Sequence, residues 1–165
     1  MKISDIFRRY RIRPLKRLGQ NFLVDNNIRD KICTALDLNR SDRVLEIGAG
    51  FGVLSERLAD TCSHLWAVEK DAKLCAILKK EILPGRDNIT VLHDDILQIR
   101  LGTLAGKHTI KVVGNLPYYI TTKILFYLVA YRTSISSAIR FLTKSTCRCL
   151  KRRTAARDSK NKLQA

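Results

Sequence analysis

The chain has 165 residues, a formal net charge of +16 and a hydrophobic share of 45%. This length suits one domain that buries a core without needing disulfides. No run of about 18 apolar residues is present, which excludes a membrane-spanning helix, and the N-terminus lacks the apolar stretch of a secretory signal. We expect a cytoplasmic, monomeric protein with no membrane partner. The Arg-rich start leaves organellar import open.

The five cysteines show no metal-binding pattern. They are scattered, and the Cys147-x-Cys149 pair has no nearby His or second pair. We interpret them as reduced thiols and expect no metal site.

Helices and strands are predicted to alternate through the middle of the chain. In chain order the sequence predicts a helix at 26–38, a strand at 43–48, a helix at 52–60, a strand at 64–69, a helix at 71–83, a strand at 88–95, a strand at 109–115 and a helix at 120–131. A loop rich in Gly and Lys separates the last two strands. The order predicts an α/β fold with a parallel, doubly wound sheet, whose ligands bind at the carboxyl ends of the strands.

The first of these helices has a clear apolar face. Ile28, Ile32, Ala35 and Leu36 recur at helical spacing. Asp25 or Asn26 is a plausible N-cap, because both side chains can accept a hydrogen bond from the first turn.

The positive charge lies at the two ends. Residues 1–20 hold seven Lys and Arg against one Asp, and residues 139–165 hold nine against one. The middle is almost balanced. Solvated tails are one interpretation. A net charge this large instead favours a polyanionic partner, and nucleic acid is the first candidate.

A glycine-rich turn follows the first predicted strand in "EIGAGFG". Gly48, Gly50 and Gly52 would let the backbone approach a ligand and leave a helix N-terminus open. The spacing departs from G-x-G-x-x-G, which disfavours a dinucleotide. Glu69 ends the next strand, 21 residues after Gly48, where a carboxylate can accept both hydroxyls of an adenosine ribose.

A second acidic position ends the third strand. Asp94 or Asp95 could accept a hydrogen bond from an adenine amino group, and the sequence leaves both open. Each acid alone could be an ordinary exposed charge. The glycine-rich turn, Glu69 and the Asp94-Asp95 pair lie at three successive strand ends, which favours an adenosine-containing cofactor.

The fourth strand runs into "VVGNLPYYIT". This segment holds an amide, a proline and two tyrosines together where the strand ends. The alternative to a functional role is a Pro-Tyr turn that merely ends a strand.

Together these motifs form the pattern of S-adenosylmethionine-dependent methyltransferases that act on an exocyclic amine. With "LGQNFLVD" upstream, the sequence resembles the ribosomal RNA adenine dimethyltransferase family over roughly residues 8 to 139. The resemblance implies a Rossmann-like methyltransferase sheet with helices on both faces and S-adenosyl-L-methionine as cofactor. It also implies N6-dimethylation of two adjacent adenines near the 3′ end of small-subunit rRNA, within an immature small ribosomal subunit.

The resemblance also implies particular residues. Its cofactor contacts fall on Asn21, Leu23, Gly48, Glu69, Asp95 and Asn115. The expected catalytic residues are Asn115, Leu116, Pro117 and Tyr118. An adenine amine is a poor nucleophile, and the Asn115 side-chain carbonyl and the Leu116 backbone carbonyl would accept its N–H groups and direct its lone pair at the methyl donor. Pro117 would fix the turn, and Tyr118 would stack on a flipped adenine. A basic N-terminal arm would grip RNA phosphates through Arg8, Arg9, Arg11, Arg13, Lys16 and Arg17.

The C-terminal part does not follow the family pattern. The family continues with Phe-x-x-Gln-Lys-Glu and a small helical domain, whereas this chain continues after Ile139 with a basic segment of no sustained helical periodicity. We expect an arm at 1–20, a methyltransferase domain at 21–139 and an atypical tail at 140–165, as in a truncated or aberrantly terminated family member. A genuine basic RNA-binding tail is the alternative.

Three function classes follow. The first is an active rRNA methyltransferase. The second is a non-catalytic RNA- or DNA-binding relative of the same fold, such as an assembly or transcription factor. The third, an NAD-dependent oxidoreductase, is disfavoured by the glycine spacing.

Overall fold

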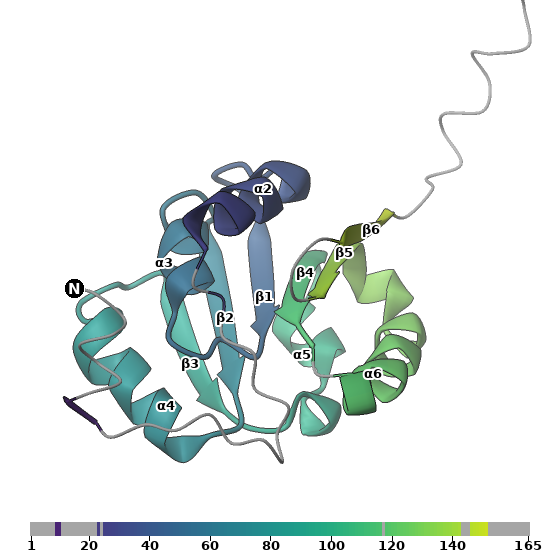
Figure 1. The fold of residues 1–165 in the computed structure, drawn as a ribbon. Coiled ribbons are helices and arrows are strands. Elements are labelled where there is room, and N and C mark those ends of the chain that lie inside the picture. The colour runs from purple at the N-terminus through teal and green to yellow at the C-terminus, as the bar shows by residue number, and fades with distance from the viewer. Residues whose placement is uncertain (1–8, 11–22, 24, 117, 143–145, 152–165) are drawn as a thin grey trace, which may run out of the picture.

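The structure is a computed structural model that describes residues 9–10, 23, 25–116, 118–142 and 146–151 (Figure 1). Its strands are β1 (Arg43–Ile47), β2 (His64–Glu69), β3 (Ile89–His93), β4 (Ile110–Asn115), β5 (Ile135–Leu142) and β6 (Thr146–Lys151). Its α-helices are α2 (Asn26–Leu36), α3 (Val53–Ala59), α4 (Ala72–Ile77), α5 (Leu101–Ala105) and α6 (Tyr118–Ala130). Short turns of other helix types are η2 (Leu78–Ile82), η3 (Ile96–Gln98) and η4 (Arg132–Ser134).

One sheet organises the molecule. Its strand order is β3-β2-β1-β4-β5-β6. The first five strands are parallel, and β6 pairs antiparallel with β5. The register aligns Ile47 with Val68 on one side and with Gly114 on the other, so β1, β2 and β4 end at one edge. The predicted parallel, doubly wound sheet is confirmed.

Helices cover both faces of this sheet (Figure 1). On one face, α5 and α6 pack over a core that includes Leu45, Val112 and Ile124. On the other, α2 and α3 pack over a core that includes Val44 and Leu65. Strands covered on both faces must be apolar at successive positions, which explains why β1, β2 and β4 are nearly continuous apolar runs.

Asp25 is the N-cap of α2. Its Oδ1 accepts hydrogen bonds from the backbone N–H of Asn27 (2.8 Å) and of Ile28 (3.3 Å). Of the two N-caps that the sequence allows, Asp25 and Asn26, the structure therefore has Asp25. The helix ends at Leu36, and its C-cap is Asp37, a non-glycine residue with φ of 49° in the left-handed region.

Several elements differ from prediction. The helix predicted at 71–83 begins as α4 and continues as the π-helical turn η2. The loop predicted before β4 contains η3 and the five-residue α5, which is too short to show a helical period. β5 crosses the predicted domain border at Ile139, and β6 lies within the segment predicted as a tail.

Lys111 connects α2 to the start of β4. Its ammonium donates to the backbone carbonyls of Leu36 (3.2 Å) and Asp37 (2.7 Å) and to Asp42 Oδ2 (2.9 Å). The carbonyls left unpaired at the end of a helix are satisfied in this way. Within the part of the chain that the structure describes, no helix is long and apolar enough to cross a bilayer.

Candidate active site

The glycine-rich turn lies at the carboxyl edge of β1, beside the end of β4. Gly48 donates its N–H to the Val68 carbonyl (2.8 Å) and has φ of +77°. A Cβ at Gly48 would stand 3.7 Å from the backbone oxygen of Asn115. The predicted cofactor turn and the predicted catalytic turn are therefore neighbours.

Gly52 serves helix packing. A Cβ there would lie 2.8 Å from Leu78 Cδ2 and 2.9 Å from Ile82 Cγ2, both on η2. Its φ of +71° also suits glycine. The sequence predicted that Gly52 clears space for a ligand, whereas in the structure it lets α3 begin close against η2.

Glu69 is fixed at the end of β2 by the backbone of two loops. Its side chain is 7% exposed. Oε2 accepts from the N–H of Gly50 (2.9 Å), and Oε1 accepts from the N–H of Asp71 (2.9 Å). Each carboxylate oxygen has a further acceptor position. The side chain thus links the glycine-rich turn to the loop after β2 and retains capacity for two more donors.

Asp95 is engaged on both of its oxygens. Oδ1 accepts from the Leu97 N–H (3.0 Å) and so caps η3, while Oδ2 pairs with Lys70 Nζ at 2.7 Å. The hydrogen bond from Lys70 lowers the pKa of the Asp95 carboxyl below its ordinary value. Asp94 is more exposed, and its Oδ1 accepts from the Asp95 N–H at 2.7 Å. A further donor that approached Asp95 would share one of these oxygens with Leu97 or with Lys70.

The turn between β4 and α6 begins in a crowded place. Leu116 is buried, and a Cβ at Gly114 would lie 2.9 Å from Leu116 Cδ2 and 3.0 Å from the Ile47 oxygen. Asn115 is half-buried and ends β4. Tyr118 begins α6. The predicted catalytic segment thus starts at the same edge as Gly48 and Glu69, and Pro117 lies outside the described residues.

Glu46 is a buried acid that the sequence analysis did not single out. It lies in β1, is 3% exposed and accepts a hydrogen bond from Ser55 Oγ of α3 at 2.5 Å. Burial raises the pKa of Glu46 to about 8; the Ser55 hydrogen bond opposes the rise and the nearby Glu69 charge adds to it. Its signal in the sequence is one acid inside the apolar run "RVLEI".

The described part of the N-terminal arm is held against α4 and η2. Arg9 pairs with Glu81 (3.0 Å), and the Tyr10 hydroxyl donates to the same carboxylate (2.6 Å). The Tyr10 ring packs on a core that includes Phe51 of the glycine-rich turn. The other predicted arm and cofactor residues lie outside the described part of the chain: Arg8, Arg11, Arg13, Lys16, Arg17 and Asn21.

Leu23, a predicted cofactor contact, is half-buried against the core formed by α2, α3 and the inner strands. Packing alone accounts for this position, and a cofactor contact by Leu23 stays a prediction.

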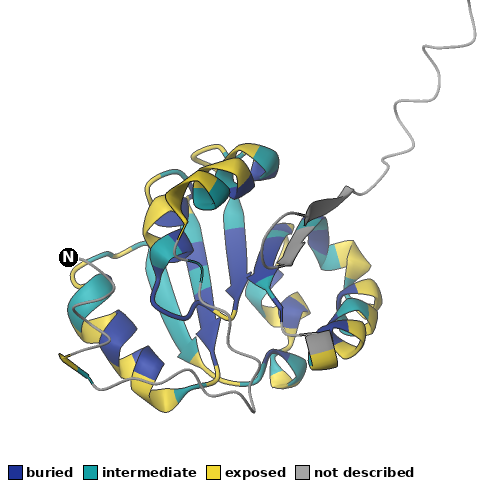
Figure 2. Cartoon of the chain, viewed as in Figure 1, coloured by how far each residue is buried: buried dark blue, intermediate teal, exposed yellow. Residues whose placement is uncertain are grey.

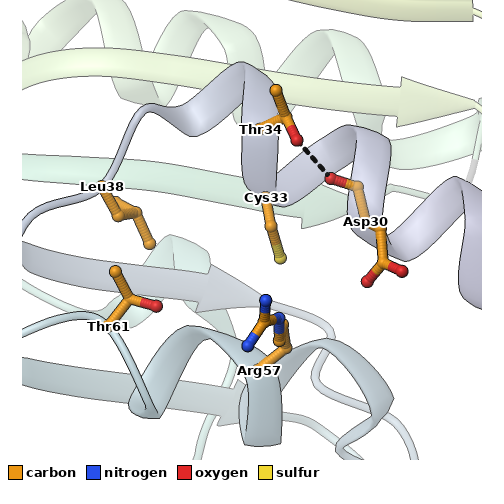
Figure 3. Close-up of a pocket in the computed structure, with 6 residues that line it drawn as sticks. All are labelled: Asp30, Cys33, Thr34, Leu38, Arg57 and Thr61. Carbon is orange, nitrogen blue, oxygen red and sulfur yellow. Dashed lines mark hydrogen bonds between the residues drawn. The ribbon is translucent and has the colours of Figure 1, made fainter.

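A separate cavity of about 240 Å³ lies between α2 and α3 (Figure 3). It is lined by Asp30, Cys33, Thr34, Leu38, Arg57 and Thr61. The Thr34 hydroxyl donates to the Asp30 carbonyl (2.9 Å), as the dashed line shows. Leu38 and Thr61 precede β1 and β2, so the cavity extends toward the amino ends of the strands. It is smaller than typical ligand pockets and contains none of the predicted site residues.

Known proteins share both the sequence and the fold. A family model described as ribosomal RNA adenine dimethylase matches residues 13–164, beyond the predicted limit of the resemblance at Ile139. The ribosomal RNA small subunit methyltransferase A of Syntrophus aciditrophicus is 37% identical over 145 residues, 86% of this chain and 51% of its own length.

Two solved structures are similar as well. The crystal structure of 23S rRNA methyltransferase ErmE aligns with a TM-score of 0.66 and 30% identity over 74% of this chain and 48% of its own. A dimethyladenosine transferase from Plasmodium falciparum aligns with a TM-score of 0.66 and 28% identity over 75% and 44%. This chain spans about half the length of the curated relatives that it matches. The parallel sheet, the polar residues at the carboxyl ends of its strands and the family-model match over residues 13–164 all support one conclusion. The chain belongs to the ribosomal RNA adenine dimethylase family.

Proposed function

We propose that this chain carries the methyl-transfer site of an S-adenosylmethionine-dependent enzyme that dimethylates N6 of two adjacent adenines near the 3′ end of small-subunit rRNA. One observation supports this above all others. The glycine-rich turn and the start of the Asn-Leu-Pro-Tyr turn meet at one sheet edge, with Gly48 facing the Asn115 backbone oxygen.

The family implies S-adenosylmethionine as the cofactor, and the residues at the edge suit it. The absence of a side chain at Gly48 leaves room beside Asn115 that a Cβ would narrow. Glu69 is immobilised by two backbone N–H groups and can accept two ribose hydroxyls on its remaining positions. We propose Gly48, Glu69 and Asn115 as the contacts of this cofactor, with Asn21 and Leu23 closing over it.

The adenine of the cofactor would lie near the end of β3. Asp95 is our first choice for its amino group, and Lys70 would then remain hydrogen-bonded to the same oxygen. Asp94 stays the alternative because it is more exposed. The Lys70 end of this ion pair is exposed to water, so loosening the pair would not prevent binding.

The target amine needs orientation more than deprotonation. The cofactor supplies a methyl group on a sulfonium, which is already activated for displacement. In our proposal the Asn115 side-chain carbonyl and the Leu116 backbone carbonyl accept the two N–H groups of adenine, so that the nitrogen lone pair points at that methyl. Pro117 would set the turn and Tyr118 would stack on the base.

Small-subunit rRNA is the proposed partner, in an immature subunit in the cytoplasm, with the protein acting as a monomer. The small-subunit relatives share 35–44% identity with this chain, whereas ErmE, named for 23S rRNA, shares 30%. The arm residues Arg8, Arg9, Arg11, Arg13, Lys16 and Arg17 would contact phosphates. Arg9 would have to exchange its contact with Glu81 for a phosphate.

The test is transfer of a radiolabelled methyl group from S-adenosylmethionine to immature small subunits that lack the modification. Modified small subunits and large subunits serve as controls. We expect label only on adenines of the unmodified small subunit. Label on large-subunit RNA alone would overturn the proposed substrate. Cofactor binding without any transfer would favour the non-catalytic RNA- or DNA-binding alternative.

Two variants locate the site. Glu69→Ala should weaken cofactor binding by roughly ten- to a hundredfold, because a charge-assisted acceptor contributes about 1.5–3 kcal/mol. Asn115→Ala should lower turnover by more than ~100-fold, a loss of about 2.7 kcal/mol. The exposed Glu56→Ala on α3 is the matched control and should change neither. Parent-like cofactor affinity in Glu69→Ala would remove Glu69 from the site.

A further inference from the structure

The outward face of α6 is unusually apolar for a solvent-exposed surface. Tyr119 is 62% exposed, Phe126 72% and Val129 59%, and among the described residues these are the large hydrophobic side chains that remain exposed. The opposite side of the helix buries Ile124 and Leu128 in the core. Figure 2 shows the exposed band along this helix.

Two aromatic rings and a cation alternate along this face. Tyr119, Lys123 and Phe126 are spaced i, i+4 and i+7, which places them on one side of a helix, and Lys123 is exposed. The two ring-bearing positions are about 10 Å apart along the axis. That span corresponds to about three stacked nucleotides at a rise of about 3.4 Å each.

The sequence that contains α6 carries formal charge of one sign. Residues 96–157 contain no Asp or Glu, although Lys and Arg recur throughout. The preceding acid in the chain, Asp95, is paired with Lys70. This positively charged segment suits a polyanionic partner.

This face begins next to the proposed target site. Tyr119 is the second residue of α6 and follows the Asn115–Leu116 segment within four positions. The short turn η3, which the Asp95 side chain caps, contacts α6. The face therefore begins near the carboxyl edge of the sheet.

We propose that Tyr119, Lys123 and Phe126 form a track for single-stranded RNA that leads away from the target adenine along α6. The two rings stack on unpaired bases that lie about three nucleotides apart, and the Lys123 ammonium contacts a phosphate in the stretch between them. The placement of the track beside a target adenine rests on the proposed function. Binding of RNA by the track does not require methyl transfer.

RNA fits this face better than a protein segment does. An apolar partner helix would have to desolvate the Lys123 ammonium between the two rings, and the neighbouring residues on the face include the polar, exposed Thr122. A single nucleic-acid strand instead combines bases that stack on aromatic rings with phosphates that a nearby cation can contact.

The test measures the affinity of the whole chain for a short fluorescent single-stranded RNA by anisotropy, without cofactor. Tyr119→Ala and Phe126→Ala should each weaken binding by roughly 5- to 150-fold. Phe126→Tyr should bind as the parent does, because it keeps the ring. Phe126→Leu should lose affinity despite its apolar side chain. Thr122→Ala on the same face is the control and should have no effect.

Salt and strandedness provide independent readouts. Lys123→Ala should reduce the slope of log affinity against log salt by about 0.7, whereas the aromatic variants should leave the slope unchanged. Fully paired RNA should not distinguish Phe126→Ala from the parent, because its bases are already stacked.

Three results would overturn the track: RNA binding unaffected by the double variant Tyr119→Ala/Phe126→Ala, parent-like binding by Phe126→Leu, or a self-association that Phe126→Ala abolishes while RNA affinity is unchanged. The second would show that the ring does not stack on a base, and the third would identify an apolar protein-docking face. Thermal-shift titration with S-adenosylhomocysteine and the methyl-transfer assay test the proposed function separately. A chain that binds RNA through α6 but transfers no methyl group would uphold the track and refute the function.

Discussion

Glu46→Gln should remove a pH dependence from the stability of this protein. In the unfolded chain the Glu46 carboxyl ionises near its ordinary pKa of 4.5, and in the fold burial raises that pKa to about 8. Between these values the folded state holds one proton more than the unfolded state. The stabilisation by this proton is fully present below about pH 4.5 and is lost as the pH rises through about 8.

The size of the effect follows from the two pKa values. One bound proton changes the free energy of unfolding by about 1.4 kcal/mol per pH unit, so the full window corresponds to on the order of 5 kcal/mol. Total stabilities of domains are about 5–15 kcal/mol, which makes this change measurable. Gln cannot ionise, and the hydrogen bond that Ser55 donates can be kept. A pH-independent offset from the new amide hydrogens is expected in addition.

Urea unfolding followed by circular dichroism, from about pH 5 to pH 9, measures the difference in stability between the parent and Glu46→Gln. The difference should grow in favour of the variant as the pH rises and level off above about pH 8. The exposed Glu56→Gln on α3 is the control and should keep the slope of the parent. Parallel curves for parent and Glu46→Gln would refute a buried carboxyl that is protonated at neutral pH.

Two further sets of variants and one labelling experiment test the packing. Gly52→Ala should lower stability by about 1–2 kcal/mol because of its positive φ and by ~1–3 kcal/mol more because of the contacts with η2. Gly85→Ala also has a positive φ but has open space around it, so it should show only the first loss, and equal losses of the two variants in urea unfolding would contradict the packing role of Gly52. Lys111→Met should lower stability by about 1–3 kcal/mol, and the exposed Lys107→Met should not. Burial raises the pKa of Cys62 to about 11, so iodoacetamide at about pH 8 should label it much faster after unfolding, as peptide mass spectrometry can measure.

The sequence alone was sufficient for the class of fold and for the elements that carry long apolar patterns. β1, β2 and β4 were predictable because strands buried on both faces are continuous apolar runs. α2 was predictable from its apolar face, and the glycines in the turn after β1 predicted the sheet edge at which a ligand would bind. The family followed from the order and spacing of motifs, which the match over residues 13–164 confirms.

Short elements were decided by tertiary contacts. α5 has five residues and β5 begins with "ISS", so neither shows a hydrophobic period of its own. α5 forms because its buried residues pack against the sheet, and β5 forms because it pairs with β4. The split of the helix after Asp71 into α4 and η2 likewise depends on what it packs against.

The roles of individual side chains at the sheet edge also required the tertiary structure. The sequence places Glu69 and Asp95 at strand ends, but only the fold shows that backbone N–H groups hold Glu69 and that Lys70 occupies one oxygen of Asp95. The sequence did not determine whether Tyr119 and Phe126 are buried or exposed. Burial depends on contacts between segments that are distant in the chain, so the buried face of an apolar helix is known only once its neighbours are placed.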